Sequence, residues 1–234
     1  MRVAITQRHL TSEVGADRDA LEHDYLLYYP RFGMTMVPIS NVCEDLEAFF
    51  GNFSIEGIFL SGGNAVHPSE WGESEVLRDN AFSAQRSSLH KRLIELAIKL
   101  RIPTIGICTG LHAINVHFGG TLTQDMSLLP ASPVSHVGAT HRVSITASEL
   151  AENLGRGAIV VNSFHHQGIR PHELAPVLRS WATCLEDGSV EGVYHPDLPI
   201  AAMVWHPERP GCDEDCSELL VRAFLKRTLF WKQD

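Results

Sequence analysis

Short apolar runs alternate with longer amphipathic stretches through the first half of the chain. The runs have the length of strands and are bounded by glycine or proline. They predict strands at 2–6, 34–38, 55–60 and 103–107. The stretches between them have helical periodicity, which predicts helices at 18–29, 44–50, 83–100 and 109–118. Strands separated by helices of this length indicate βαβ units and a mostly parallel sheet.

The second half of the chain is richer in strands. They are expected at 141–146, 158–161, 181–185, 190–194 and 200–205, with helices at 148–154 and 217–230. The Asp-Gly of EDGS indicates a hairpin between two of these strands. No repeat or linker divides the sequence. We therefore expect one α/β domain, residues 1–234, around a mostly parallel central sheet.

The composition is ordinary for a globular protein, with 44% hydrophobic and 20% charged residues. The net charge of −9, without any basic run, argues against binding to nucleic acid or to an anionic membrane surface. No segment approaches the roughly 18 apolar residues of a membrane helix, and the start, MRVAIT, lacks the pattern of a signal peptide. Five scattered cysteines do not suit a disulfide framework. A reducing, cytoplasmic compartment is expected.

Three groups of residues with chemical potential each follow an apolar strand. They are SGG at 61–63, Cys108 within GICTG, and HPE at 206–208. In open parallel sheets, sites form beyond the carboxyl ends of strands. The G-x-C-x-G spacing is typical of a nucleophile elbow, and the following helix N-terminus favours a thiolate. The backbone N–H groups of Thr109 and Gly63 are the expected oxyanion donors.

A thiolate nucleophile needs a base, and the base needs a group to orient it. His206 and Glu208 are two residues apart, with Pro207 stiffening the link. We predict a triad of Cys108, His206 and Glu208, because triads are defined by the roles of their members and not by chain order. Taken separately, Cys108 is equally explained as a buried structural cysteine, and HPE as the surface end of a strand.

At this point the residues show a family resemblance. SGG, GICTG and WHPE resemble the class I glutamine amidotransferase superfamily, and NSFHHQG at 162–168 resembles its γ-glutamyl hydrolase (peptidase C26) branch, which includes γ-glutamyl-γ-aminobutyrate hydrolase. The start (AITQR, ADRDALEHDY), the middle (HVGATHRV) and the end (LPIAAMVWHPE) are similar to γ-glutamyl-CDP-amidate hydrolases. The similarity spans essentially the whole chain.

The resemblance implies a glutamine amidotransferase-like, flavodoxin-like fold, a three-layer sandwich with helices around a mixed central sheet. It also implies hydrolysis without cofactor or metal. Cys108 would attack the δ-carbonyl of a γ-glutamyl amide, His206 would protonate the departing amine, and Glu208 would hold His206. Water would then release glutamate from the thioester. The backbone around Ser163 and Phe164 would help to hold the glutamyl group.

Two positions depart from the family pattern. His112 stands where the superfamily usually carries a glutamine that binds the glutamyl end of the substrate. Its imidazole would still donate to a carboxylate, more strongly if protonated; alternatively, it marks a substrate with a different acyl group. Thr109 stands where this branch often has arginine, which removes a positive charge beside the thiolate.

Other polar residues have open alternatives. Arg8, or Arg18, either contacts an anionic group of the substrate or pairs with nearby acidic residues. Of His165 and His166, one is expected to face the site. His136 and His141 have no ligand-spaced partners in the sequence, so we expect them to line the pocket or to satisfy loop carbonyls rather than bind a metal. Cys212 and Cys216 are expected as surface thiols.

The leading hypothesis is a hydrolase of a small-molecule γ-glutamyl substrate. A glutaminase subunit that delivers ammonia to a separate synthetase is the alternative, and it requires a partner protein. A non-catalytic relative is a third hypothesis, which the presence of Cys108, His206 and Glu208 disfavours. A homodimer is equally compatible with the sequence.

Overall fold

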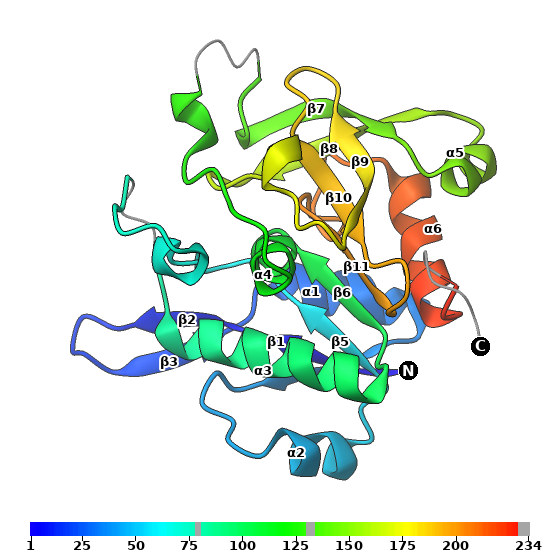
Figure 1. Ribbon diagram of the computed structural model, residues 1–234. Coiled ribbons are helices and arrows are strands. Elements are labelled where there is room, and N and C mark those ends of the chain that lie inside the picture. Colours follow the sequence, from blue (N-terminus) through cyan, green and yellow to red (C-terminus); the bar gives the residue numbers. More distant parts are fainter. Residues whose placement is uncertain (78–80, 130–133, 229–234) are drawn as a thin grey trace.

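The computed structural model describes residues 1–77, 81–129 and 134–228, and its centre is a nine-stranded sheet (Figure 1). In spatial order the strands are β4 (Thr35–Ile39), β1 (Arg2–Thr6), β5 (Gly57–Leu60), β6 (Thr104–Ile107), β11 (Ile200–Met203), β10 (Val190–Tyr194), β9 (Arg179–Cys184), β7 (Val137–Ile145) and β8 (Ala158–Phe164). The pairs from β4 to β11 are parallel, and the pairs from β11 to β8 are antiparallel. The expected mixed sheet is confirmed.

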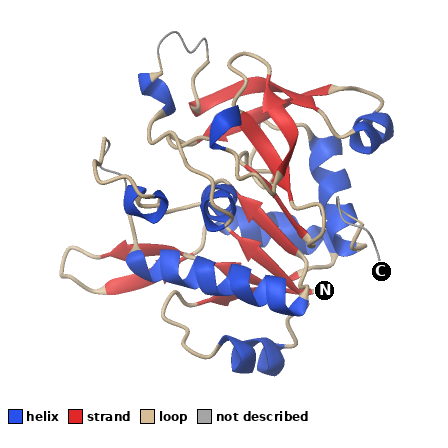
Figure 2. Ribbon diagram, in the orientation of Figure 1, coloured by secondary structure: helices blue, strands red, loops and turns tan. Residues whose placement is uncertain are grey.

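Helices cover both faces of this sheet, as the colouring of Figure 2 makes clear. One face carries α2 (Leu46–Phe53), α3 (Ala84–Leu100) and α4 (Thr109–His117), and the other carries α1 (His23–Tyr28), α5 (Ser148–Leu154) and α6 (Glu214–Leu225). Alternation along β1 explains the two layers: Ala4 packs in the core beneath α3, whereas Val3 and Ile5 pack in the core beneath α1 and α6. The three-layer α/β architecture is therefore confirmed.

Short 3-10 turns complete the described elements, at η1 (Tyr29–Phe32), η2 (Pro68–Trp71), η3 (Met126–Leu128) and η4 (Pro171–Glu173). Within the described ranges, no helix combines the length and the apolar character needed to cross a membrane. All five cysteines lie in these ranges and are free thiols. Cys216 is buried within α6, so the expectation that it is a surface thiol is wrong.

The helix predicted at 18–29 is wrong in its first part. Residues there form a hairpin of β2 (Arg8–Thr11) and β3 (Asp17–Ala20), and α1 begins only at His23. The Asp19 carboxylate accepts hydrogen bonds from the Ser40 hydroxyl (2.6 Å) and the Asn41 N–H (2.9 Å), which hold it in an extended strand. This tertiary pairing overrides the local helical pattern.

Strand lengths in the second half also differ from the prediction. β7 and β8 pair from Val137 with Phe164 to Ser144 with Ala158, with one register shift between Val137 and Ala139, so each is longer than expected. The extension carries residues 162–164 to the end of the sheet, close to the candidate site. The predicted final helix corresponds to α6, which ends at Leu225, and residues 229 and 230 of that prediction lie outside the described ranges.

Candidate active site

The carboxyl ends of β5, β6 and β11 meet at one edge of the sheet because these strands are parallel neighbours. Cys108 sits at the bend between β6 and α4 with φ 53° and ψ −108°, a strained conformation for a residue other than glycine. A side chain at Gly110 would overlap the Leu60 carbonyl, and one at Gly106 would approach the Gly110 backbone to 2.7 Å. Glycine at both positions lets α4 pack closely against the strands.

The structure brings the three predicted triad side chains together. His206 Nδ1 lies 2.6 Å from Glu208 Oε1, and the imidazole also shares a hydrogen bond with the Cys108 thiol. A carbon added to Gly62 would approach His206 Cε1 to 2.7 Å and Cys108 Cβ to 3.4 Å. The absence of a side chain at Gly62 therefore lets the imidazole reach the sulfur.

Electrostatics at this group favour a thiolate beside an imidazolium. Burial raises the pKa of the Cys108 thiol, but hydrogen bonds from His206 and from Thr109, with the charge of the imidazolium, bring the pKa below its ordinary value. Burial lowers the pKa of His206, whereas its bonds to Cys108 and Glu208 raise the pKa to about 9. Both shifts stabilise the charged pair.

Two side chains that the sequence analysis did not identify bond to residues of the predicted triad. The Asn162 carboxamide accepts from the His206 N–H (2.9 Å) and donates to the His206 carbonyl (2.8 Å). The Tyr29 hydroxyl donates to Glu208 Oε2 at 3.4 Å. Asn162 stands in NSFHHQG and could have been found from that motif, whereas no local signal marks Tyr29.

The glycine loop at 61–63 lies beside Cys108. The Gly62 N–H donates to the Tyr25 hydroxyl at 3.0 Å, so this N–H is already engaged. Gly63 lines the same cavity as Cys108, and the Thr109 hydroxyl donates to the Gly63 carbonyl at 3.3 Å. The two predicted oxyanion donors, Gly63 and Thr109, thus belong to adjoining backbone segments next to the sulfur.

A cavity of about 230 Å³ opens on the sulfur. Seven of the residues predicted for the site line it together with Cys108: Arg8, Gly63, Thr109, His112, Phe164, His165 and His206. Ser163 is buried outside it, and its hydroxyl donates to the His136 carbonyl at 3.0 Å. Arg209, which the sequence analysis did not identify, also lines the cavity.

Two buried imidazoles give one part of the cavity its hydrogen-bonding character. His165 Nδ1 is 2.7 Å from the Gln167 carbonyl, which only accepts, so the proton is on Nδ1 and Nε2 carries a lone pair. Burial lowers the pKa of His165 to about 3 and of His112 to about 4. Both rings are neutral near pH 7, so His112 does not carry the proton considered for it. The Nε2 atoms of both rings have no hydrogen-bond partner among the described residues.

Arginine and phenylalanine side chains form another part of the cavity wall. Arg8 pairs with Glu22 at 2.8 Å while lining the cavity, so its geometry is compatible with both of the roles expected for it. Phe164 is 43% exposed, and the Arg209 guanidinium lies over its ring, 5.1 Å from the centroid. Arg18 lies in β3 and is not among the residues that line the cavity.

A buried histidine–carboxylate network lies behind His165. His136 Nε2 is 2.8 Å from Asp187 Oδ2, and His141 Nε2 is 3.3 Å from Glu191 Oε2. Among the residues that the structure describes, neither the His136 nor the His141 imidazole lines this cavity or bonds to a loop carbonyl, so that expectation is wrong: the carboxylates of Asp187 and Glu191 pair with them. Burial raises the pKa of Glu191, yet the surrounding imidazoles bring it below its usual value.

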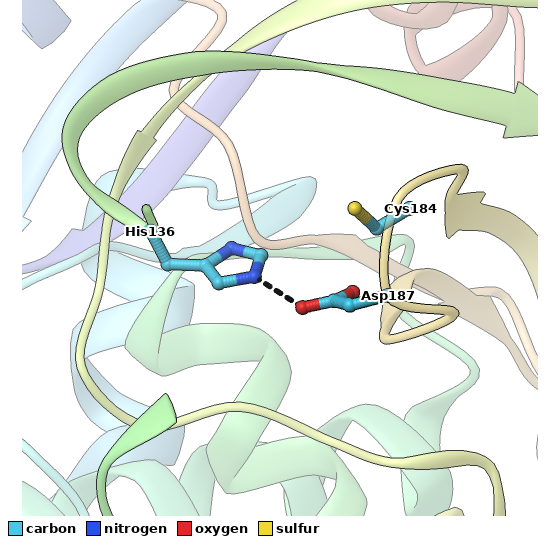
Figure 3. A group of neighbouring side chains, drawn as sticks. All are labelled: His136, Cys184 and Asp187. Atoms are coloured by element: carbon cyan, nitrogen blue, oxygen red, sulfur yellow. Dashed lines mark hydrogen bonds and ion pairs between the residues drawn. The ribbon is translucent and has the colours of Figure 1, made fainter. Parts of the chain in front are cut away.

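Two overlapping groups in the described residues have the composition of a metal site: His136 with Cys184 and Asp187, and His136 with His165 and Glu191. Figure 3 shows the first, with the imidazole directed at the Asp187 carboxylate and the thiol beside it. In the first group, the hydrogen bond from His136 Nε2 to Asp187 Oδ2 engages two of the atoms that would bind an ion, and Asp187 also accepts from the Ser189 hydroxyl at 2.7 Å. Metal-free chemistry stays a prediction.

Comparison with known proteins adds family-level information. The family model of Peptidase C26 matches residues 5–208. A Schizosaccharomyces pombe protein named provisionally as a glutamine amidotransferase is 34% identical over 183 residues, 75% of this chain and 70% of that protein. Gamma-glutamyl-gamma-aminobutyrate hydrolase PuuD of Escherichia coli K12 is 32% identical over 185 residues, 73% of this chain and 71% of that protein.

A solved structure shares the fold. A Thermoplasma acidophilum protein described provisionally as one of the subunits of a GMP synthase aligns with a TM-score of 0.66 at 20% identity. The alignment covers 97% of this chain and 94% of that chain. At this level of identity, the similarity concerns the arrangement of helices and strands.

Proposed function

The chain belongs to the Peptidase C26 family of glutamine amidotransferase-like hydrolases, and we propose that it cleaves the γ-glutamyl amide bond of a small γ-glutamyl compound through Cys108, His206 and Glu208. The observation that carries the proposal is the buried contact of the three side chains at a strained strand-to-helix bend. The name of the Escherichia coli relative supports the choice of bond.

The proposed reaction begins with a thiolate–imidazolium pair. Cys108 Sγ bonds to the δ-carbonyl carbon, and the carbonyl oxygen becomes an oxyanion that accepts from the N–H groups of Gly63 and Thr109. The C–N bond then breaks, and the amine leaves with the proton of His206. His206 next takes a proton from water, which attacks the thioester and releases glutamate. Glu208 stabilises the imidazolium throughout.

The neutral imidazoles suggest how the glutamyl end is held. The bare lone pair of His165 Nε2 requires a donor, and the α-ammonium group of a γ-glutamyl substrate supplies one. The buried Glu191 carboxylate behind this ring adds favourable negative potential for the ammonium group. His112 is assigned to the same acyl end, with the backbone at Ser163 and Phe164. Arg8 is assigned to an anionic group of the substrate.

The test is to trap the acyl-enzyme. The protein is incubated with a panel of γ-glutamyl amides, quenched in acid, digested and analysed by mass spectrometry. A glutamyl adduct on the peptide of Cys108, absent from Cys108→Ala and accumulating in wild type before glutamate appears, is the expected result. No adduct and no glutamate release with any member of the panel would overturn the proposal.

The same assay separates the alternative of a glutaminase subunit. Turnover of free glutamine that appears only when a candidate synthetase is added would support that function, and the amidotransferase name of one relative is the observation that favours including it. A reducing, cytoplasmic location is proposed with either function, because all five thiols are free.

A further inference from the structure

Arg86 is a buried guanidinium directly behind the glycine loop. It belongs to the first turn of α3, and only 1% of its surface is exposed. Its hydrogen-bond partners among the described residues are two backbone carbonyls, a hydroxyl and the His90 imidazole, with no carboxylate among them. Buried cations are normally paired with an anion. The lack of a carboxylate partner here calls for a functional explanation.

The contacts of Arg86 determine how the loop is turned. Its Nη2 donates to the carbonyls of Ser61 (2.5 Å) and Gly62 (2.9 Å). Its Nη1 lies against Gly63 so closely that a side chain at that position would overlap it, and Gly63 has a φ of +148°. The guanidinium and Gly63 are therefore fitted to one another.

The geometry of the peptide bond gives these contacts a direction. In a trans peptide the carbonyl and the N–H of the next residue point to opposite sides, and no cis peptide occurs in the described ranges. The Ser61 carbonyl faces Arg86, and the N–H of the same peptide points away to the Tyr25 hydroxyl (3.0 Å). The Gly62 carbonyl also faces Arg86, so the Gly63 N–H of that peptide is turned away from the guanidinium.

The charge of Arg86 adds a second effect. Burial lowers the pKa of Arg86 to about 10, and the group remains a cation near neutral pH. His90 beside it is neutral, because burial and the charge of Arg86 lower the pKa of His90 well below its usual value. The Arg86 cation and the Cys108 thiolate attract one another. The Glu22 carboxylate also interacts with this cation but forms no hydrogen bond with it, and the positive potential of Arg86 reaches the nucleophile.

We propose that Arg86 is a positioning residue that turns the Gly63 N–H toward the oxyanion and whose charge supports the Cys108 thiolate. The inference rests on the proposed function. Thr109 replaces the arginine that this branch often carries beside the sulfur. In this protein Arg86, behind the glycine loop, supplies a positive charge instead.

The test compares two changes at Arg86 with a matched control. Arg92 lies on the same helix and donates to two backbone carbonyls, of Cys43 and Glu44, away from the site. Arg86→Lys keeps the charge but loses the guanidinium group that bonds to the Ser61 and Gly62 carbonyls. We expect kcat for a γ-glutamyl anilide to fall about tenfold or more with little change in KM. Arg86→Gln removes the charge as well as the guanidinium group, and we also expect the pH profile of Cys108 alkylation to shift to higher pH. Arg92→Gln changes neither readout.

Chemical rescue guards against a purely structural effect. Arg86 lines a second cavity of about 360 Å³, so guanidinium at low millimolar concentration has a route to the space left in Arg86→Ala. Recovery of kcat there, and none in Arg92→Ala, is expected. Wild-type kcat in Arg86→Lys, or an unmoved alkylation profile in Arg86→Gln, would overturn the inference. If wild type hydrolyses no γ-glutamyl compound, the proposed function fails, and the alkylation profile still tests Arg86.

Discussion

The carboxamide of Asn162 forms hydrogen bonds with both the N–H and the carbonyl of His206. Its oxygen accepts from the His206 N–H at 2.9 Å, and its nitrogen donates to the His206 carbonyl at 2.8 Å. The same nitrogen contacts the carbonyls of Arg209 and Pro210. The position of the imidazole is therefore set by β8 as well as by the strand that precedes it in the chain.

Asn162→Ala removes these hydrogen bonds to His206. We expect kcat to fall by about 10- to 100-fold with a smaller change in KM, because a misplaced imidazole stabilises the transition state less well. Asn115→Ala is the control: Asn115 is equally buried and bonds three backbone groups, at Thr121, Glu173 and Ala175, but away from the cavity. Steady-state kinetics and thermal unfolding are measured together. Equal losses of kcat in the two variants would contradict the assignment.

Thiol alkylation should select Cys108 at neutral pH. Its pKa lies below the ordinary thiol value, so its thiolate forms first as the pH rises, whereas burial raises the pKa of Cys43 and of Cys212 and brings that of Cys184 and of Cys216 to about 12. Iodoacetamide labelling followed by peptide mass spectrometry gives the order of reaction. Labelling of Cys43 ahead of Cys108 would count against the ion pair.

Glu208→Gln should move the basic limb of the pH–rate profile. The pKa of His206 is raised to about 9, so activity that needs the imidazolium is retained below this value and lost as the pH rises through it. Removing the Glu208 charge lowers that pKa, and the limb in kcat/KM shifts to lower pH while kcat falls. Tyr29→Phe removes only the 3.4 Å contact to the carboxylate and should leave the limb in place. A limb unmoved in Glu208→Gln would separate this carboxylate from the imidazole.

His165→Phe should erase discrimination for the α-amino group. Wild type is expected to prefer a γ-glutamyl anilide over the glutaryl anilide that lacks this group. In the variant, kcat/KM for the γ-glutamyl compound should fall about tenfold or more, the effect of a hydrogen bond to a charged group, and that for the glutaryl compound should stay. His117→Phe, at the last residue of α4 and outside this cavity, is the control. Parallel losses for both substrates would argue against recognition of the ammonium group.

Glu191→Gln should destabilise the fold most at mildly acidic pH. The Glu191 pKa is lowered, so its contribution is present above its unfolded pKa and lost as the pH falls through the folded value. Burial lowers the pKa of His141, but Glu191 raises it above the usual value; its contribution is present below the unfolded pKa of about 6.5 and is lost as the pH rises through the folded value. Breaking a buried pair costs on the order of 3 kcal/mol.

Urea unfolding of wild type and of Glu191→Gln at a series of pH values gives the difference in their free energies of unfolding. This difference should be largest at pH values between the titration of Glu191 and that of His141, and smaller at lower and at higher pH. A difference that is constant with pH would show that the network stabilises the protein by packing alone.

The parts of the site that sequence analysis could predict are local. Strand-end punctuation and the glycines around Cys108 act within a few residues, so the pattern alone indicates the bend and its neighbours. Tyr25 and Glu191 were not predicted, because their partners at Gly62 and His141 are brought to them only by the packing of separate elements. The hairpin at Asp19 was missed for the same reason, since its stabilising bonds come from Ser40 and Asn41.

The position of β11 has a consequence for biosynthesis. This strand lies between β6 and β10 in the sheet, yet the ribosome makes it only after β7, β8, β9 and β10. Until then, the strand that leads to Cys108 has an open edge where β11 will pair. Cys108 therefore has no His206 to pair with until residues 206–208 have been made. A nascent chain that stalls earlier lacks the base of the proposed triad and is exposed to aggregation through that edge.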